Sequence, residues 1–531
     1  MNGPLPDAPG ELRTRAPDDI GSVARGGAMA AAGAATAAVG GFVLTLVVGR
    51  TLGSNGAGLF FEAVALFAIC AGITTLGADT GVVRSLSRCR ALGTLREIRP
   101  TLVVALAPVL VAGLVVTIAA WLLAPPLADL MSHGHGTPTT ERYLRALLVF
   151  LTFGTLSTVV VQATRGLGGV LPFVAIQNVF LPIARPAAIM LSVAAGWSVL
   201  AVPIAWGVLF VPALIGACVV LHHQYSGQVR LITRSTPPSR PLRTIATDFW
   251  RFSSVRGVSA TLDITLVWFD VLLVGALTST RDAGVYATAS RFVLAGTIVL
   301  QAMRLAIAPQ ISALMSTGQT ERAEGVYRVA TIWVIASSWP LYLAMAVLSP
   351  RLLAFFGKDF RVGSQALTIL AMAMLVSLGT GNVGTVLLMA GKSSWVMANK
   401  VVALSVNVAL NLLLVPHLGI DGAALAWAAA IAIDNMAAMV EVRNGLGLHG
   451  YGRGSYVAAA VAIVCFGVWG LLVRSVLDLG NGAIAIYLVG ACTVYALVLW
   501  RCRRSMLLDE FLKSFTKVSR RGRSVPAPEA N

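Results

Sequence analysis

Residues 46–63, LVVGRTLGSNGAGLFFEA, decide how the chain is organised, because a related stretch returns as residues 272–289, LLVGALTSTRDAGVYATA. The two stretches are identical at Leu46/Leu272, Val48/Val274, Gly49/Gly275, Ala57/Ala283, Gly58/Gly284 and Ala63/Ala289. Phe60 is matched by Tyr286. We interpret the pair as an internal repeat, the alternative being a chance similarity between glycine-rich turns.

The composition places the chain in a membrane. Of its 531 residues, 57% are hydrophobic and 12% are charged, and the mean hydropathy is +0.80. Soluble domains are about 45–50% apolar and about 25% charged, so an ordinary cytosolic enzyme and a disordered chain are both excluded. A spanning helix needs about 20 apolar residues, so the length allows about fourteen spans. We expect an all-α polytopic membrane protein.

Windows of about 19 residues predict the spans one by one. Twelve fall into two sets of six, at 27–49, 58–80, 101–124, 144–164, 169–193 and 199–221, then at 252–277, 284–309, 328–349, 364–389, 397–415 and 421–440. Two further spans lie at 455–474 and 482–500. The predicted divisions are a disordered cytoplasmic tail (1–26), an N-terminal six-helix lobe (27–225), a cytoplasmic linker (226–251), a C-terminal six-helix lobe (252–441), an extra transmembrane hairpin (454–500) and a basic cytoplasmic tail (501–531).

The net charge of +17 is explained by topology. Basic residues gather in alternate loops, which include Arg84–Arg99, the 222–251 connection, Arg443, Arg453 and the C-terminal tail. Positive residues stay on the cytoplasmic side, so we expect both termini in the cytoplasm of a cell that carries the protein in its plasma membrane. This reading needs no nucleic-acid partner.

The repeat also predicts how the two lobes are related. Six spans separate its copies, and an even number gives both copies the same orientation across the membrane. Gly166 and Gly391, in two later turns, are spaced almost equally. Parallel halves with a site between them are a plan found in transporters.

Ionisable residues inside spans are the strongest functional signals. Arg256, Asp263 and Asp270 are spaced by seven, so they share one helical face. Each central carboxylate costs about 2.5–3.5 kcal/mol on insertion scales, so this face should line a lumen. Asp263 and Asp270 are candidates for coupling a proton or sodium ion. The alternative is that they pair with arginines of neighbouring helices.

Arginines supply the candidate substrate contacts. Arg185 lies deep in its span between Pro182 and Pro186, which break the helix where the backbone lines a cavity. Arg291 lies about two turns inside its own span, whereas Arg304 is close enough to a span end to reach water. Guanidinium groups match phosphate oxygens, so Arg185, Arg256 and Arg291 suit an anionic, phosphate-bearing cargo. The alternative is ion pairing with Glu62, Asp263 and Asp270.

Asn407 and Asn411 are four residues apart and share a face of the eleventh span. They are candidate sugar-binding residues, with hydrogen bonding between helices as the alternative. Asp434 and Asn435 in the next span resemble them, and we assign those two no role.

Motifs for cofactors, metals and covalent catalysis fail. The run Ala390-Gly391-Lys392-Ser393 ends like a phosphate-binding loop, but Val386 stands where the first glycine is needed. The six cysteines show no CxxC pairing, and His133 and His135 lack a nearby third ligand. We therefore expect no cofactor, no metal and no enzymatic activity.

Three stretches resemble a known group of transporters. The run Gly49–Gly53 through Gly56–Gly58, with Gly77-Ala78-Asp79 and Val83-Arg84, resembles the opening of the polysaccharide transporter family. Asn407 to Ala426 (NVALNLLLVPHLGIDGAALA) and Asp270 to Arg291 resemble the second half of the same superfamily. This is the multidrug/oligosaccharidyl-lipid/polysaccharide (MOP) exporter superfamily, and the strongest resemblance is to Wzx-like lipid-linked oligosaccharide flippases.

The resemblance implies two pseudo-symmetric six-helix lobes in a V around a central cavity, which opens alternately to either side. The implied cargo is a polyprenyl-pyrophosphate-linked oligosaccharide, and a cationic cavity fits Arg185, Arg256 and Arg291. Lipid II flippases of this superfamily carry two extra C-terminal helices, which are suggested to hold the lipid tail. The spans at 455–474 and 482–500 are their counterparts here.

We therefore expect a flippase for a lipid-linked glycan in cell-surface polysaccharide or cell-wall assembly. Its partners would be the glycolipid, membrane lipids and polysaccharide polymerase or glycosyltransferase machinery. The alternative is a proton- or sodium-coupled multidrug exporter of the same superfamily. A membrane glycosyltransferase, polymerase or ligase is disfavoured, because the longest outer loop is about 20 residues and such enzymes need a sizeable one.

Overall fold

The computed structural model describes residues 16–131, 138–230, 232, 239–476 and 480–501. Within these ranges the regular structure is helical throughout, with no strand. Eleven of the helices described are long and apolar enough to cross a membrane. The predicted all-α membrane architecture is confirmed.

The helices form an N-terminal group, a long connecting helix, a C-terminal group and a C-terminal hairpin. The N-terminal group comprises α1 (Ala16–Thr75), α2 (Ala78–Ala91), η1 (Leu95–Glu97), α3 (Ile98–Leu122), α4 (Ala124–Met131), α5 (Pro138–Leu148), α6 (Leu151–Leu167), α7 (Leu171–Phe173), η2 (Val174–Phe180), α8 (Leu181–Ala194), α9 (Ala201–Gly207) and α10 (Phe210–Val229). The connecting helix is α11 (Leu242–Leu277). The C-terminal group comprises α12 (Thr280–Ala295), α13 (Ile298–Ser316), α14 (Thr320–Ala354), η3 (Lys358–Gly363), α15 (Ser364–Gly379), α16 (Val383–Met389) and α17 (Ser393–Leu446). The hairpin comprises α18 (Arg453–Ala462), η4 (Ile463–Val468), α19 (Trp469–Val476) and α20 (Asn481–Arg501).

Two of the long helices turn at a glycine. In α1 the turn is at Gly53 (φ 66°), and in α17 it is at Gly419 (φ 57°). Positive φ is readily available only to glycine, so these residues divide each helix into a first arm and a second arm. The local sequences are alike, LGSNGAGL at 52–59 and LGIDGAAL at 418–425. Fourteen crossings remain a prediction, because each turned helix is a single element among the eleven.

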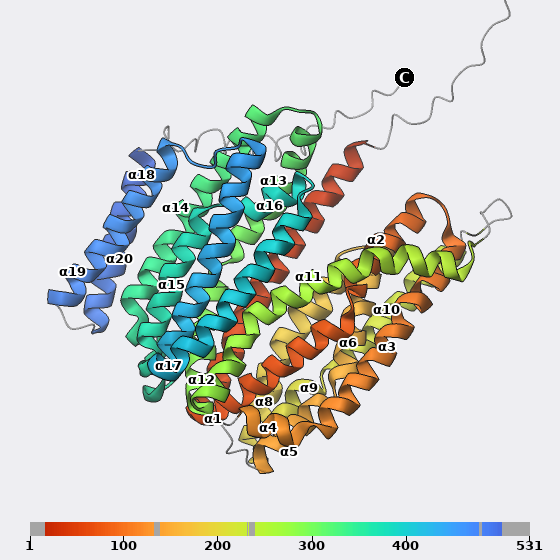
Figure 1. The fold of residues 1–531 in the computed structure, drawn as a ribbon, viewed down its shortest axis with the longest axis horizontal. Helices are drawn as coiled ribbons and strands as arrows, with labels where there is room; N and C mark the ends of the chain where they lie inside the picture. Colours follow the sequence, from red (N-terminus) through yellow and green to blue (C-terminus); the bar gives the residue numbers. More distant parts are fainter. Residues whose placement is uncertain (1–15, 132–137, 231, 233–238, 477–479, 502–531) are drawn as a thin grey trace, which may run out of the picture.

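The two groups converge at one end of the molecule and diverge at the other (Figure 1). We call the converging end the closed end; it carries the Gly53 and Gly419 turns and the start of α12. The opposite end carries the connection from α10 to α11 and the finish of α17 at Leu446, and we call it the basic end.

At the closed end the two copies of the internal repeat meet. A Cβ atom on Gly58 would lie 1.7 Å from the Thr280 carbonyl oxygen, and one on Gly284 would lie 2.3 Å from the Ser54 carbonyl oxygen. Gly58 and Gly284 are matched positions of the repeat, as are Ser54 and Thr280. The contact is therefore pseudo-symmetric, and it favours a true repeat over a chance similarity of turns.

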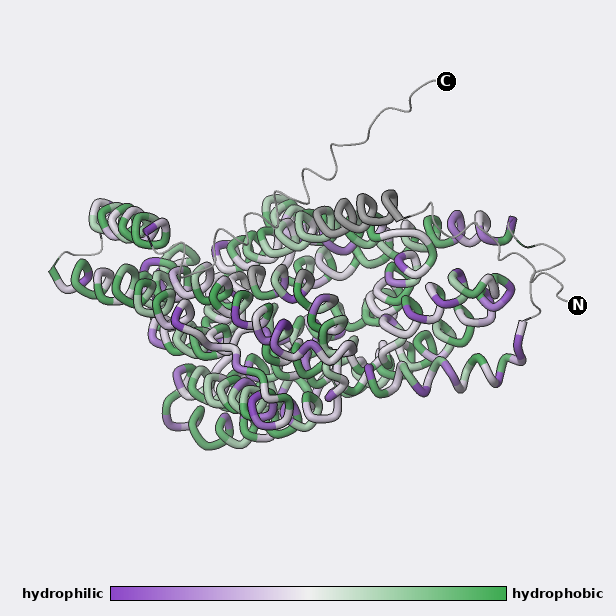
Figure 2. Tube along the Cα trace, turned by 90° about the horizontal axis from the view of Figure 1, so that it is seen from above, coloured by the Kyte–Doolittle hydropathy of each residue, from purple (hydrophilic) through white to green (hydrophobic). Residues whose placement is uncertain are grey.

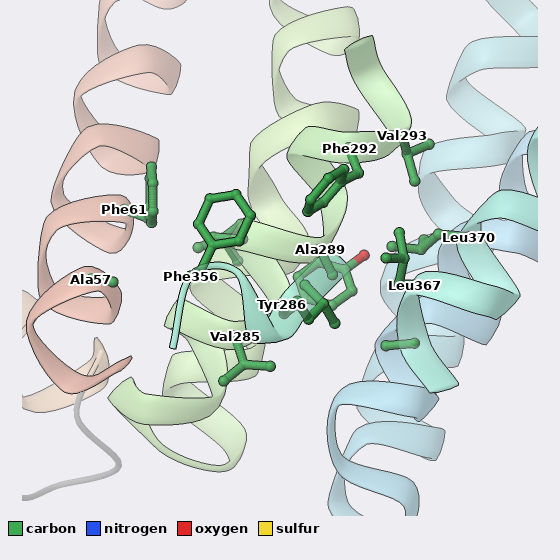
Figure 3. Packing of buried hydrophobic residues seen from close by; sticks show 14 of the residues in the cluster. Ala57, Phe61, Val285, Tyr286, Ala289, Phe292, Val293, Phe356, Leu367 and Leu370 are labelled. Atoms are coloured by element: carbon green, nitrogen blue, oxygen red, sulfur yellow. The ribbon is translucent and has the colours of Figure 1, made fainter. Parts of the chain in front are cut away.

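A buried apolar cluster surrounds this contact (Figure 3). The Phe42 ring packs edge-on against Phe292 and Phe356, at centroid distances of 5.2 and 5.5 Å. Phe42 lies on the first arm of α1, whereas Phe292 and Phe356 belong to the C-terminal part of the chain. Close packing of small residues and rings is what joins helices in lipid, where the hydrophobic effect between helices is weak.

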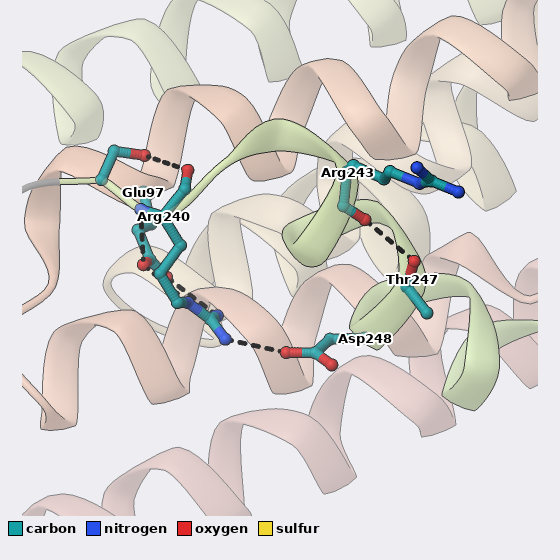
Figure 4. Close-up of polar contacts among 6 residues, drawn as sticks. Glu97, Arg240, Arg243, Thr247 and Asp248 are labelled. Atoms are coloured by element: carbon teal, nitrogen blue, oxygen red, sulfur yellow. Dashed lines mark hydrogen bonds and ion pairs between the residues drawn. The ribbon is translucent and has the colours of Figure 1, made fainter.

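The start of α11 is attached to the N-terminal group (Figure 4). Arg240 Nε donates to Glu97 Oε1 (2.8 Å), Nη2 donates to Glu97 Oε2 (3.1 Å) and Nη1 donates to Asp248 Oδ2 (2.8 Å). The hydrogen bonds from Glu97 and Asp248 raise the pKa of Arg240. Further along α11, a Cβ on Gly257 would lie 2.7 Å from the Leu76 carbonyl oxygen. The first part of α11 therefore packs on the N-terminal group.

The C-terminal hairpin packs against α14, where the Tyr495 hydroxyl donates to the Ala336 carbonyl oxygen (2.5 Å). Hydrophobic residues cover most of every helix, and hydrophilic residues occur in short stretches (Figure 2). This distribution fits helices that cross a membrane.

Several predicted boundaries differ from the structure. Helix α1 begins at Ala16, inside the segment predicted to be a disordered tail, and residues 1–15 lie outside the described residues. The predicted linker is shorter, because α10 continues to Val229 and α11 begins at Leu242. His133, His135 and nearly all of the basic tail also lie outside the described residues.

Candidate functional site

The predicted polar face of α11 changes character along the helix. Arg256 is exposed, Asp263 has a side chain 52% exposed, and Asp270 is only 1% exposed. The three residues are thus on one helical face but in three environments. Only the part near Arg256 and Asp263 is open enough for a polar ligand.

Asp270 lies at the centre of a buried hydrogen-bonded cluster. Asn411 Nδ2 on α17 donates to Asp270 Oδ1 (2.9 Å), and the Tyr286 hydroxyl on α12 donates to Asp270 Oδ2 (3.0 Å). Asn407 is also fully buried one turn before Asn411. These bonds tie α11 to the C-terminal group, so the helix-joining role of the asparagines is what the geometry displays.

A cavity of about 20 Å³ adjoins this cluster, lined by Asp270, Tyr286, Ser290 and apolar neighbours. A cavity of at least about 10–15 Å³ admits one water molecule. The space beside Asp270 is therefore large enough for a single water or a dehydrated ion.

Asp263 is paired with a different residue. Lys400 Nζ, on the first arm of α17, lies 2.5 Å from Asp263 Oδ1. The Lys400 side chain is 20% exposed. This pair is a second bond from α11 to the C-terminal group, nearer the basic end than Asp270.

Two of the predicted arginines lie over aromatic rings. The Arg291 guanidinium carbon is 3.9 Å from the Trp268 ring centre and 5.9 Å from that of Phe61. The Arg185 carbon is 3.9 Å from the Trp206 ring centre and 4.6 Å from that of Phe210. Rings of this kind stabilise a cation without neutralising its charge.

The arginines do not pair with the predicted carboxylates. Among the described residues, no ion pair joins Arg185, Arg256 or Arg291 to an acidic side chain. Arg185 Nε and Nη2 are buried without a hydrogen-bond partner. The positive charges at these sites are consequently available to an anion.

Glu62 is unpaired in the same way. It is fully buried, and neither of its side-chain oxygens has a hydrogen-bond partner. A Cβ on Gly275 would lie 2.0 Å from Glu62 Oε1, so the carboxyl group fits against bare backbone of α11. Gly275 is required here to leave room for Glu62.

Solved structures of transporters share this arrangement of helices. A lipid II flippase, MurJ, in an inward closed conformation superposes with a TM-score of 0.65 at 12% identity, over 88% of this chain and 98% of that chain. An inward-facing multidrug resistance MATE family transporter of the MOP superfamily superposes with a TM-score of 0.61 at 14% identity, over 77% and 94%. The chain has the fold of the MOP superfamily transporters.

Sequence comparison agrees with this MOP-type fold. The MatE family model matches residues 261–413, which run from α11 into the first arm of α17. The probable low-salt glycan biosynthesis flippase Agl15 of Haloferax volcanii is 25% identical over 203 residues, 38% of this chain and 43% of that protein. The match thus spans less than half the length of that relative. These findings confirm the predicted resemblance, and the proteins matched are transporters and flippases rather than catalytic enzymes.

The MOP-type fold brings together only some of the predicted site residues. Asp270, Asn407 and Asn411 form one cluster, and Arg291 lies on the same helix as Tyr286. Arg185 lies apart, in an aromatic cluster of the N-terminal group formed by Phe67, Trp206 and Phe210.

Two partners in this site were not predicted. Tyr286 was visible in the sequence as the repeat position opposite Phe60, where only one copy carries a hydroxyl. Lys400 lies seven residues before Asn407, so helical spacing places both on one face of α17. Both signals were present, but neither identifies its acidic partner on another helix.

An apolar groove of about 790 Å³ lies between the C-terminal group and the hairpin. Trp339, Met372, Leu471 and Tyr456 are among the residues that line it. Arg474 lies in its wall, and its Nη1 donates to the Val347 carbonyl oxygen (3.5 Å). The groove is suited to a flexible hydrocarbon chain.

Proposed function

We propose that this protein is a flippase that moves a polyprenyl-(pyro)phosphate-linked oligosaccharide from the cytoplasmic to the outer leaflet of the plasma membrane. The observation that carries the proposal is the set of arginines without acidic partners. Arg256 is exposed on α11, and Arg291 lies beside the same helix over Trp268. A pyrophosphate group brings the negative charge that these guanidinium groups lack.

The basic end would face the cytoplasm, with both chain termini on that side. Cargo would then enter where the two helix groups diverge, near Arg256, while the closed end blocks the outer side. Opening of the Gly58–Gly284 contact and convergence at the basic end would release the head group outside. This is alternating access about a site between two halves.

The polyprenyl tail would remain in contact with lipid. The apolar groove beside α18 and α19 offers a surface for it, as the hairpin prediction anticipated. Delivery to polysaccharide polymerase or glycosyltransferase machinery would follow on the outer side.

Asp270 and Asp263 are the proposed ion-coupling residues. Asp270 is favoured, because it adjoins a cavity large enough for one ion or water. Asp263 is occupied by Lys400, so ion binding there would require Lys400 to move away.

The alternative is a proton- or sodium-coupled exporter of cationic drugs, as the MATE neighbours suggest. The half-exposed carboxylate of Asp263 is the feature that favours it. The unpaired arginines oppose it, because like charges repel strongly where the dielectric constant is low.

Deletion of the gene tests the proposal. We expect polyprenyl-linked glycan to accumulate inside the cells and the surface polymer to disappear, with sensitivity to cationic drugs unchanged. Rescue by Arg291→Gln should fail, whereas rescue by the control Arg322→Gln should succeed, because Arg322 is exposed and contacts only the neighbouring Gln319. Retention of cationic dyes with normal glycolipid levels would overturn the flippase and support the exporter.

A further inference from the structure

A second polar cavity, of about 240 Å³, lies within the C-terminal group. Its walls come from α13, from both arms of α17 and from the break between α15 and α16. The break is formed by Thr380, Gly381 (φ 67°) and Asn382. Interrupted helices at membrane depth are tolerated where their backbone is buried in protein or lines a cavity.

The broken segment is fixed by its own hydrogen bonds. The Tyr327 hydroxyl donates to the Thr380 carbonyl oxygen (2.8 Å), and the Thr380 hydroxyl donates to Asn435 Oδ1 (3.1 Å). Asn435 Nδ2 in turn donates to Ser377 Oγ (3.2 Å). Asn435 is therefore committed to holding the cavity wall.

Other polar groups of the cavity have no protein partner. Asn382 is 4% exposed, and its Nδ2 makes no hydrogen bond. In the described part of the chain, Gln301, Arg304 and Asp434 also have no hydrogen bond or ion pair. The cavity thus presents amide and guanidinium donors together with one carboxylate acceptor.

The charges of these uncommitted groups cancel. Arg304 is positive and Asp434 is negative, whereas Lys400, also in the wall, is paired with Asp263. A phosphate would need a surplus of positive charge, and a metal cation would meet the nearby Lys400 and Arg304. A neutral ring with several hydroxyl groups matches mixed donors and acceptors, because each hydroxyl both donates and accepts.

We propose that this cavity is a sugar-binding subsite, which holds one neutral sugar ring of the head group while the arginines beside α11 hold the phosphates. The inference rests on the proposed function and names the part of the cargo that the C-terminal group reads. The size allows one ring, since ligand pockets for larger molecules are about 300–1,000 Å³. Lys400 connects the two subsites, because it lines the cavity and bonds to Asp263 on α11.

The test uses the full-length protein in lipid nanodiscs and saturation-transfer NMR with galactose, N-acetylglucosamine, rhamnose and the anionic glucuronate, each added alone. We expect at least one of the neutral sugars to bind, and Asp434→Asn and Asn382→Leu to weaken its binding about tenfold. The matched control is Asp421→Asn, a half-buried carboxylate on the same arm of α17 but outside the cavity. Unfolding temperatures of all variants confirm folding, and the conservative Arg304→Lys provides a second probe.

A parallel measurement separates this subsite from the proposed flippase. Inorganic pyrophosphate should raise the unfolding temperature of the wild type and of Asp434→Asn, but not that of Arg291→Gln. If pyrophosphate binds in this way and no neutral sugar binds, or if all three aspartate and asparagine variants bind sugar equally, the sugar subsite is overturned while the flippase stands. Stabilisation by sodium chloride over choline chloride that disappears in Asp434→Asn, without sugar binding, would also overturn it and assign a cation site. Normal glycolipid levels after gene deletion would instead overturn the flippase.

Discussion

Contacts within each helix group differ in kind from contacts between the groups. Within a group, or from α11 to one group, the contacts are directional and polar, as in Arg240–Glu97 and Asp270–Asn411. Between the groups at the closed end, Gly58 and Gly284 pack on bare backbone. Arg50 Nε also crosses to the Phe355 carbonyl oxygen (2.9 Å), but Arg50 is exposed. The difference indicates which contacts are built to separate, because opening the closed end strands few buried polar groups.

The largest effect is expected from filling the glycine contact. Gly58→Val would place side-chain carbons against the Thr280 carbonyl oxygen, now 1.7 Å from the Cβ position, and overpacking costs about 1–3 kcal/mol. We expect loss of complementation in a deletion strain while the protein still folds. Gly41→Ala on the same helix is the control, since nothing lies within 4 Å of its Cβ position. Full activity of Gly58→Val would show that the closed end does not need this contact.

The next effect concerns stability within the C-terminal group. Asp270→Ala leaves the Tyr286 hydroxyl and Asn411 Nδ2 without their acceptor, and each unsatisfied buried donor costs about 1–3 kcal/mol. We expect a clearly lower unfolding temperature in detergent, measured by tryptophan fluorescence. The comparison is Asp263→Asn, whose half-exposed ion pair is worth about 1 kcal/mol or less. Equal shifts for the two variants would mean that burial does not separate these carboxylates.

A smaller effect is expected at the basic end. Glu97→Gln removes the charged acceptor of Arg240, but the Arg240 side chain is 42% exposed and regains water. We expect a loss of about 1 kcal/mol and transport reduced only a fewfold, because the bond lies between α11 and its own neighbours. Faster proteolysis near the start of α11 would be the accompanying observation. An inactive Glu97→Gln protein with normal stability would place this bond among the moving contacts.

The smallest effect on stability is expected from Glu62→Gln. The carboxyl group is buried without a partner, which favours its neutral form, and glutamine has the same shape and no charge. We expect an unfolding temperature close to that of the wild type. Transport should lose part of its dependence on external pH if Glu62 ionises when the closed end opens, and an unchanged pH profile would exclude that role. Glu62→Ala serves as the comparison, because it leaves a cavity.

Much of the fold could be predicted, because hydropathy and the repeat act over long stretches of chain. The positions of the spans and the two halves follow from residues such as Gly58 and Gly284, whose spacing is visible without coordinates. The site was less predictable. Helical spacing placed Arg256, Asp263 and Asp270 on one face, but their exposure depends on which neighbours cover each turn. Partners such as Lys400 come from helices distant in sequence, and no local pattern specifies them.

The Gly58–Gly284 contact has a consequence that is best expressed in the terms used for homodimers. It is an isologous interface within one chain, since each copy offers the other the same surface. In a true homodimer every substitution appears twice, whereas here the copies diverge independently. Asp270 and Tyr286 correspond to Leu44 and Phe60 in the first copy, so the carboxylate and its hydroxyl partner exist on one side alone. Joining the halves in one polypeptide thus permits a single buried charge beside an axis where symmetry would impose two.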